Sequence, residues 1–159
     1  MNGTPYIYLV MTDYSWHIPD PSSQPEFYQD IPTKRAMAWV IDSVLVLLLC
    51  LLILPFTAFL ALFFLPLLWW TVSFVYRVVT ISKGSATLGM RVMSIEFRTL
   101  AGDQFDLPLA LKHTAGYSFS LLFVPLHIIS VISILASERR QSLVDHVLGT
   151  VAINKRAGS

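Results

Sequence analysis

The sequence is poor in charged residues and in cysteine. Only 13% of its 159 residues are charged, whereas soluble domains carry about 25%. A single cysteine, Cys50, excludes an intramolecular disulfide framework and a thiolate metal site. The formal net charge of +1 gives none of the basic excess that nucleic-acid binding requires. Because 55% of the residues are hydrophobic and the mean hydropathy is +0.63, lipid is the expected solvent of this chain.

Basic residues are absent from the first 33 positions, and Lys34 is the first of them. The same segment contains four acidic residues and several prolines, which favour extended backbone. A secretory signal peptide would begin with basic residues, so we do not expect one here. The composition predicts a polar, acidic, Pro-rich N-terminal tail over residues 1–33, a membrane domain over 34–156, and a short C-terminal end over 157–159.

The longest uncharged run separates Asp42 from Arg77. It would span about 51 Å as one helix, against a hydrocarbon core about 30 Å thick. Pro55 lies near its middle and disturbs a continuous helix. We therefore expect a transmembrane hairpin with helices over about 36–54 and 56–80. Basic residues precede the first helix and follow the second, so both ends are expected on the cytoplasmic side.

The region after the hairpin changes its periodicity. Apolar and polar residues alternate over 93–98, which predicts a short strand, and residues 150–154 form a second candidate strand. Between them lies a third apolar region, 107–136, with Pro125 past its middle. A single crossing would place the later basic residues outside, so a helix that breaks near Pro125 and returns is favoured. The fold class is an all-α integral membrane protein with a small cytoplasmic strand pair.

Asp42 is the charged residue whose position is most unusual. It lies two helical turns beyond Arg35, too far along the axis for a direct ion pair. An ionised carboxylate at that depth is costly, so it should be protonated, paired, or exposed to a polar cavity. The expected partners are Arg77, Lys112 and His113. Two interpretations stay open, a buried pair that fixes helix packing and an intramembrane functional group.

Three segments in a fixed order carry a family resemblance: Lys34–Asp42, Gly84–Arg91 and Arg139–Thr150. Together they resemble the RDD family of small integral membrane proteins, which is named for one arginine and two aspartates. Arg35, Asp42 and Asp145 match those three positions, and the resemblance extends over residues 34–153. Two positions depart from the family pattern, since His146 follows Asp145 rather than preceding it and Met90 replaces a common lysine.

The resemblance implies a membrane location, and cation/proton antiport has been proposed for some relatives. Arg35, Asp42 and Asp145 could then form a functional charge cluster in which Asp42 exchanges a proton for a small monovalent cation. Carboxylate oxygens suit hard cations, and a nearby arginine lowers a carboxylate pKa. We expect Asp42→Asn to abolish such proton movement in vesicles.

Other motifs do not predict enzymatic chemistry. The glycine spacing over 84–89 is that of a phosphate loop, but Met90 and Arg91 stand where lysine and a hydroxyl residue are required. Ser142, three residues before Asp145, is better interpreted as a helix cap than as a nucleophile. The histidines lack metal-ligand spacing. The chain is therefore expected to be non-enzymatic, without a cofactor or metal.

Two functions remain open. The first is an accessory or assembly component of a membrane complex, with other membrane subunits, or further copies of itself, as partners in the lipid bilayer of the bacterial inner membrane. The second is a homo-oligomeric monovalent cation/proton antiporter that uses Asp42. Three short membrane segments hardly enclose a pathway alone, so transport would need several copies, which favours the accessory function.

Overall fold

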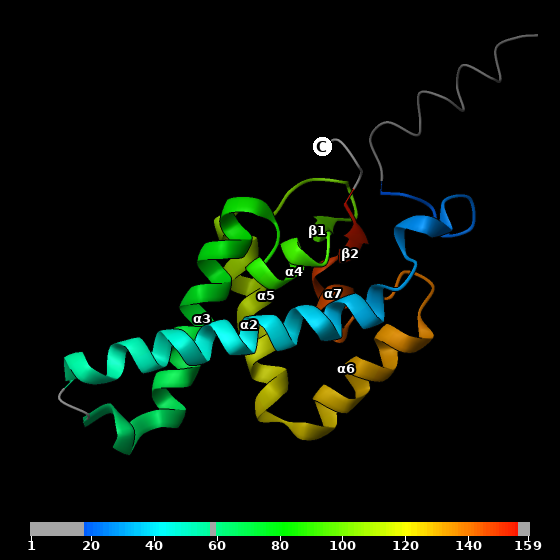
Figure 1. Ribbon diagram of the computed structural model, residues 1–159. Coiled ribbons are helices and arrows are strands. Elements are labelled where there is room, and N and C mark those ends of the chain that lie inside the picture. The colour runs from blue at the N-terminus through cyan, green and yellow to red at the C-terminus, as the bar shows by residue number, and fades with distance from the viewer. Residues whose placement is uncertain (1–17, 58–59, 156–159) are drawn as a thin grey trace, which may run out of the picture.

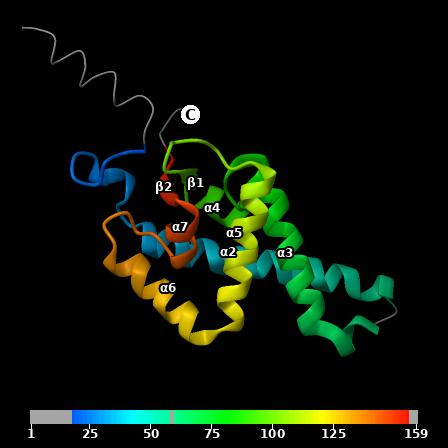
Figure 2. The same ribbon diagram turned by 180° about the vertical axis from the view of Figure 1, so that it is seen from behind.

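The computed structural model describes residues 18–57 and 60–155 and is mainly helical (Figure 1). The predicted C-terminal end and the first half of the predicted tail, residues 1–17, lie outside these ranges. One long helix, α2 (Ile31–Ile53), runs across the molecule (Figures 1 and 2). Helix α3 (Leu65–Gly84) packs against α2, and α5 (Leu107–Leu122) packs against α3. Most of the remaining elements lie beside the N-terminal half of α2, away from the turn that joins α2 to α3.

The predicted hairpin is present, with a wider turn than expected. Helix α2 continues into the 3-10 turn η2 (Leu54–Thr57), and a second 3-10 turn, η3 (Leu60–Phe64), precedes α3. Helix α3 therefore begins at Leu65 rather than at 56, because Pro66 occupies its first turn, where the missing N–H costs nothing. Two helical segments, Pro25–Thr57 and Leu62–Gly84, are long and apolar enough to cross a membrane.

The third apolar region is broken, as predicted. Helix α5 ends at Leu122 and α6 (Val124–Ala136) begins two residues later, bent away by 118°. Phe123 at the break has an extended backbone, and Pro125 lies in the first turn of α6. In a continuous helix the Pro125 nitrogen would have to donate to the Leu121 carbonyl, and the proline ring would clash with that carbonyl, so the helix breaks before Pro125.

The predicted strand pair is also present. Strand β1 (Ile95–Thr99) pairs antiparallel with β2 (Thr150–Asn154), in a register that places Ile95 opposite Asn154 and Thr99 opposite Thr150. The predicted start of the first strand at 93 was two residues early, because a short helix that the sequence did not predict, α4 (Leu88–Val92), ends there. A turn-like residue with positive φ, Ser94, separates that helix from β1.

The second half of the predicted tail is folded. Helix α2 begins at Ile31, which is fully buried, and the short 3-10 turn η1 (Pro25–Phe27) lies against the strand pair. Tyr28 is buried against Val151 and Ile153 of β2, and its hydroxyl donates to the carbonyl of Pro19 at 2.6 Å. The segment before α2, β1 after α3, and β2 at the end of the described chain therefore meet at one end of the molecule.

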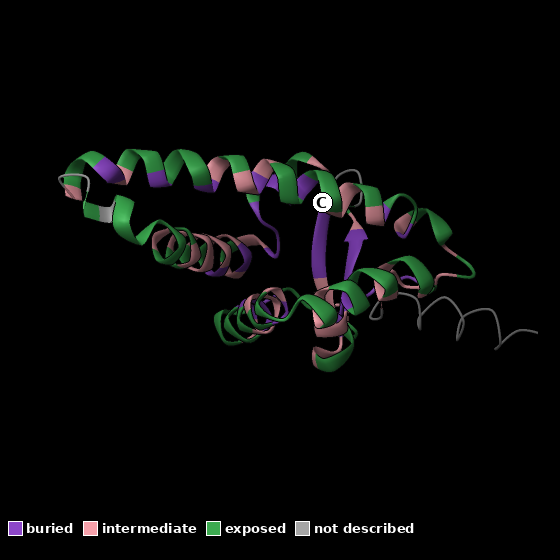
Figure 3. Ribbon diagram, turned by 90° about the horizontal axis from the view of Figure 1, so that it is seen from below, coloured by how far each residue is buried: buried purple, intermediate pink, exposed green. Residues whose placement is uncertain are grey.

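The distribution of buried and exposed apolar side chains is that expected of a membrane protein. The buried core lies under the strand pair and the N-terminal half of α2, whereas the outer faces of α2, α3 and α6 expose large apolar side chains (Figure 3). Apolar surface on this scale is unfavourable in water and is stable in lipid.

Candidate functional site

Asp145 is the centre of the first polar network. It lies in the first turn of α7 (Leu143–Leu148) and is fully buried. Ser142 caps this helix: its hydroxyl accepts from the Asp145 amide, and the Asp145 carboxylate accepts from the Ser142 amide at 2.9 Å and hydroxyl at 2.8 Å. The predicted capping role of Ser142 is confirmed, in the form of a capping box.

Three further side chains converge on the Asp145 carboxylate. The Arg35 guanidinium from α2 reaches Oδ2 at 2.8 Å, and His113 Nε2 from α5 lies 2.9 Å from Oδ1. The Thr150 hydroxyl at the start of β2 donates to Oδ1 at 3.0 Å. The His113 ring also packs against Phe97 and Phe105, tilted to the first and edge-on to the second, with ring centroids 4.5 and 5.5 Å away. Asp145 thus ties together α2, α5, α7 and β2.

The surroundings of Asp145 set its acidity. Burial alone would raise its pKa, but the Arg35 charge, the His113 contact and the Ser142 hydrogen bonds outweigh burial and hold the pKa well below the ordinary value of 3.8. The carboxylate is therefore ionised at neutral pH and acts as a fixed anion.

This pKa predicts how stability depends on pH. Because the folded pKa lies below the unfolded one, the ionised carboxylate stabilises the fold at pH values above 3.8, and this contribution is lost progressively as the pH falls below 3.8. We expect the melting temperature in detergent to fall over that acidic range. The melting temperature of Asp145→Asn should lack the part of this fall that comes from protonation of Asp145. Identical dependence of the melting temperature on pH in the two proteins would refute the role of the Asp145 carboxylate.

Asp42 belongs to a second network, separate from the first. It is buried in α2 and accepts three hydrogen bonds: the Tyr76 hydroxyl donates to Oδ1 at 2.6 Å, the Thr87 hydroxyl to Oδ2 at 2.6 Å, and the Gly89 amide to Oδ1 at 2.8 Å. Tyr76 comes from α3, while Thr87 and Gly89 belong to the loop and short helix α4 that follow it. Asp42 therefore fastens α4 and its loop to the first span.

None of the three predicted partners forms a hydrogen bond or an ion pair with Asp42 in the described part of the chain. His113 contacts Asp145, and Lys112 is exposed. The Arg77 guanidinium lies 4.1 Å from the ring centroid of Tyr117 and forms no ion pair with Asp42. Among the described residues, the structure thus brings Arg35, His113 and Asp145 together and holds Asp42 apart with neutral donors. The sequence analysis considered only charged or titratable partners for Asp42, and so it did not predict the neutral donors Tyr76, Thr87 and Gly89.

The sequence matches a known protein family. The RDD family model matches residues 31–149, which contain all three predicted motif residues and, apart from Thr150, both networks. This chain belongs to the RDD family. No curated protein and no solved structure matches it. The family match begins at Ile31, where α2 begins, and ends at Gly149, immediately before β2.

The three residues that name the RDD family have distinct structural roles here. Arg35 and Asp145 form an ion pair between the first span and the segment before β2, and the Arg35 guanidinium also lies 5.5 Å from the Phe97 ring. Asp42 is held by hydroxyl and amide donors two turns deeper along α2. The glycine-flanked loop over 84–89 does not resemble a phosphate cradle, because its Thr87 caps α4 and its Gly89 amide is already bonded to Asp42.

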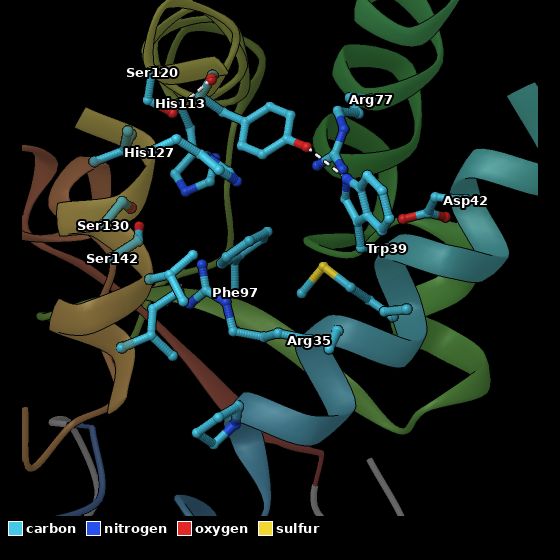
Figure 4. Close-up of a pocket in the computed structure, with 18 of the residues that line it drawn as sticks. Arg35, Trp39, Asp42, Arg77, Phe97, His113, Ser120, His127, Ser130 and Ser142 are labelled. Atoms are coloured by element: carbon cyan, nitrogen blue, oxygen red, sulfur yellow. Dashed lines mark hydrogen bonds between the residues drawn. The ribbon is translucent and has the colours of Figure 1, made fainter. Parts of the chain in front are cut away.

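A groove of about 740 Å³ lies beside both networks (Figure 4). Its walls come mainly from α2, α5 and α6, with Arg77 contributed by α3, and Arg35, Trp39 and His113 also border it. Trp39 donates to the Tyr117 hydroxyl at 3.0 Å across this space. No group of three or more metal-ligating side chains occurs within residues 18–57 and 60–155. The polar atoms around the groove suit an anion or an amphiphile better than a cation.

Proposed function

We propose that this RDD protein is a non-enzymatic accessory subunit that stabilises or assembles a larger complex in the bacterial inner membrane. The observation that carries the proposal is the state of its two buried motif carboxylates. Asp145 accepts from four residues and Asp42 from three, each through fixed internal donors. A carboxylate that exchanges protons for cations must release its ligands in each cycle, whereas these ligands hold the fold together.

The topology that we propose places both termini on the cytoplasmic side. Helices α5 and α6 measure about 24 and 20 Å, less than the hydrocarbon core of about 30 Å, so neither leg crosses alone. Their 118° bend favours a re-entrant element. The pairing of β1 with β2 supports the same arrangement, because a full crossing by this region would separate the two strands. Basic residues then gather on one side, as the charge rule requires.

The native composition of the protein tests this function. A tagged copy is extracted from its own membrane in mild detergent, sized, and analysed for proteins in constant proportion. The proposal predicts other membrane subunits in a fixed ratio to the tagged chain. An assembly of the chain with itself alone would contradict it and would favour the homo-oligomeric cation/proton antiporter.

A matched variant sharpens that experiment. Asp103 is an exposed acidic residue near β1, so Asp103→Asn changes the net charge without disturbing either network. We expect the same partners with Asp103→Asn as with the unaltered chain. Loss of partners with this variant would mean that surface charge, rather than the folded membrane domain, holds the complex.

A further inference from the structure

The groove of about 740 Å³ is largely apolar and lies where lipid would meet the protein. Helix α6 contributes Val131, Ile134 and Leu135, and α2 contributes Ala36 and Val40. Both helices also expose large apolar side chains on their outer faces. The groove is therefore a recess among elements that face the bilayer, so its ligand can enter from the bilayer itself.

The size of the groove distinguishes between possible occupants. An α-helix with side chains is about 10–12 Å wide, so 740 Å³ would hold fewer than two helical turns. A partner's transmembrane helix would need several turns of contact. The volume falls instead within the range of about 300–1,000 Å³ that is typical of small-ligand sites. A single flexible chain fits this space better than a helix does.

The charges at the groove favour an anion. Arg77 lines it, and its guanidinium lies over the Tyr117 ring with no carboxylate at ion-pair distance among the described residues. Arg35 lines it too and gives one guanidinium nitrogen, Nη1, to Asp145. Asp42 is the one carboxylate among the described lining residues, and its oxygens already accept three hydrogen bonds. Two guanidinium groups thus border the groove with unused donors (Figure 4).

We propose that the groove binds one anionic phospholipid of the surrounding bilayer. Its phosphate lies at Arg77, with Arg35 as the second cation, and an acyl chain lies along Val131, Ile134 and Leu135. Guanidinium groups match phosphate oxygens in geometry as well as in charge. This lipid site does not depend on the accessory function, since an antiporter could hold the same lipid.

Native mass spectrometry of the purified protein tests the site. The protein is delipidated and then given equal amounts of phosphatidylglycerol and phosphatidylcholine with identical acyl chains. We expect preferential retention of phosphatidylglycerol. Arg77→Gln should reduce that preference about fivefold, the factor expected for one basic residue near an anionic lipid surface. Lys83→Gln removes an exposed cation of the same helix outside the groove and should change nothing.

A second pair of variants tests the acyl chain. Val131→Trp narrows the groove, whereas Ile132→Trp places the same side chain at the neighbouring exposed position, which does not line it. Only the first should reduce phosphatidylglycerol retention. Each variant must keep the elution volume and melting temperature of the parent. Arg77→Lys keeps the positive charge and should retain most of the preference for phosphatidylglycerol, which separates loss of the cation from a disturbed fold. Equal retention of both lipids, unaltered preference in Arg77→Gln, or equally tight binding of chain-free glycerol phosphate would overturn the proposal.

Discussion

Replacing Asp145 by asparagine should destabilise the protein by about 3–5 kcal/mol, the cost of breaking a buried ion pair by removing one partner. The variant leaves the Arg35 charge without its anion. It also replaces one carboxylate oxygen by an NH2 group, which cannot accept the hydrogen bonds that this oxygen accepted. Because Asp145 joins α2, α5, α7 and β2, one substitution disturbs four elements. Thermal or denaturant unfolding in detergent, followed by circular dichroism, measures the effect.

The control and the partner variant make this prediction specific. Asp103→Asn removes an exposed carboxylate and should change stability by less than about 0.5 kcal/mol. Arg35→Gln should be costly alone, and the double variant with Asp145→Asn should cost less than the two single effects combined. Strict additivity would show that the two residues do not act as a pair.

Replacing Gly89 by alanine should cost about 1–3 kcal/mol or more, because the added methyl group has no space. An ideal Cβ at this position would overlap the carbonyl oxygen of Ala38 and lie 2.8 Å from Oδ1 of Asp42. Helix α4 would have to move away from α2, which would also lengthen the hydrogen bond from the Gly89 amide to Asp42. The same unfolding measurement detects this loss.

Gly116→Ala is the matched comparison. It also adds one methyl group to a helix, but its Cβ would meet the tip of Val144 at 3.0 Å rather than backbone. A side chain can shift by a few tenths of an ångström, and alanine gains about 1 kcal/mol of helix propensity over glycine. We expect a much smaller loss than for Gly89→Ala. Equal losses at the two positions would mean that the approach of α4 to α2 is not restrictive.

The architecture followed from the sequence wherever a strong local rule applied. A long uncharged run with Pro55 inside it required a hairpin, Pro125 broke the third apolar region, and the alternation around Ile95 required a strand. The turn of the hairpin was harder to locate, because two prolines bound it and Pro66 sets the start of α3. The fold of residues 18–30 was missed, since their polar, Pro-rich composition conceals the long-range packing of Tyr28 on β2.

The candidate site was predictable only in its charged members. Arg35, Asp42 and Asp145 were found because charges near apolar runs are conspicuous, and His113 was already a candidate partner. The donors to Asp42 are a tyrosine hydroxyl, a threonine hydroxyl and a backbone amide, which carry no charge and no characteristic spacing. One signal was present: Asp42 precedes the uncharged run and Tyr76 ends it, so an antiparallel hairpin places the two residues at similar depth.

Cation-driven proton movement in vesicles tests most directly whether the family's charged residues serve as internal ties rather than as an ion-exchange site. Vesicles that contain the purified protein are compared with vesicles that contain the Asp42→Asn variant and with empty vesicles. The internal pH of each is followed after addition of sodium or potassium. We predict that the unaltered chain moves no more protons than empty vesicles do. Proton movement that requires the protein and disappears in a folded Asp42→Asn variant would contradict the account and establish transport.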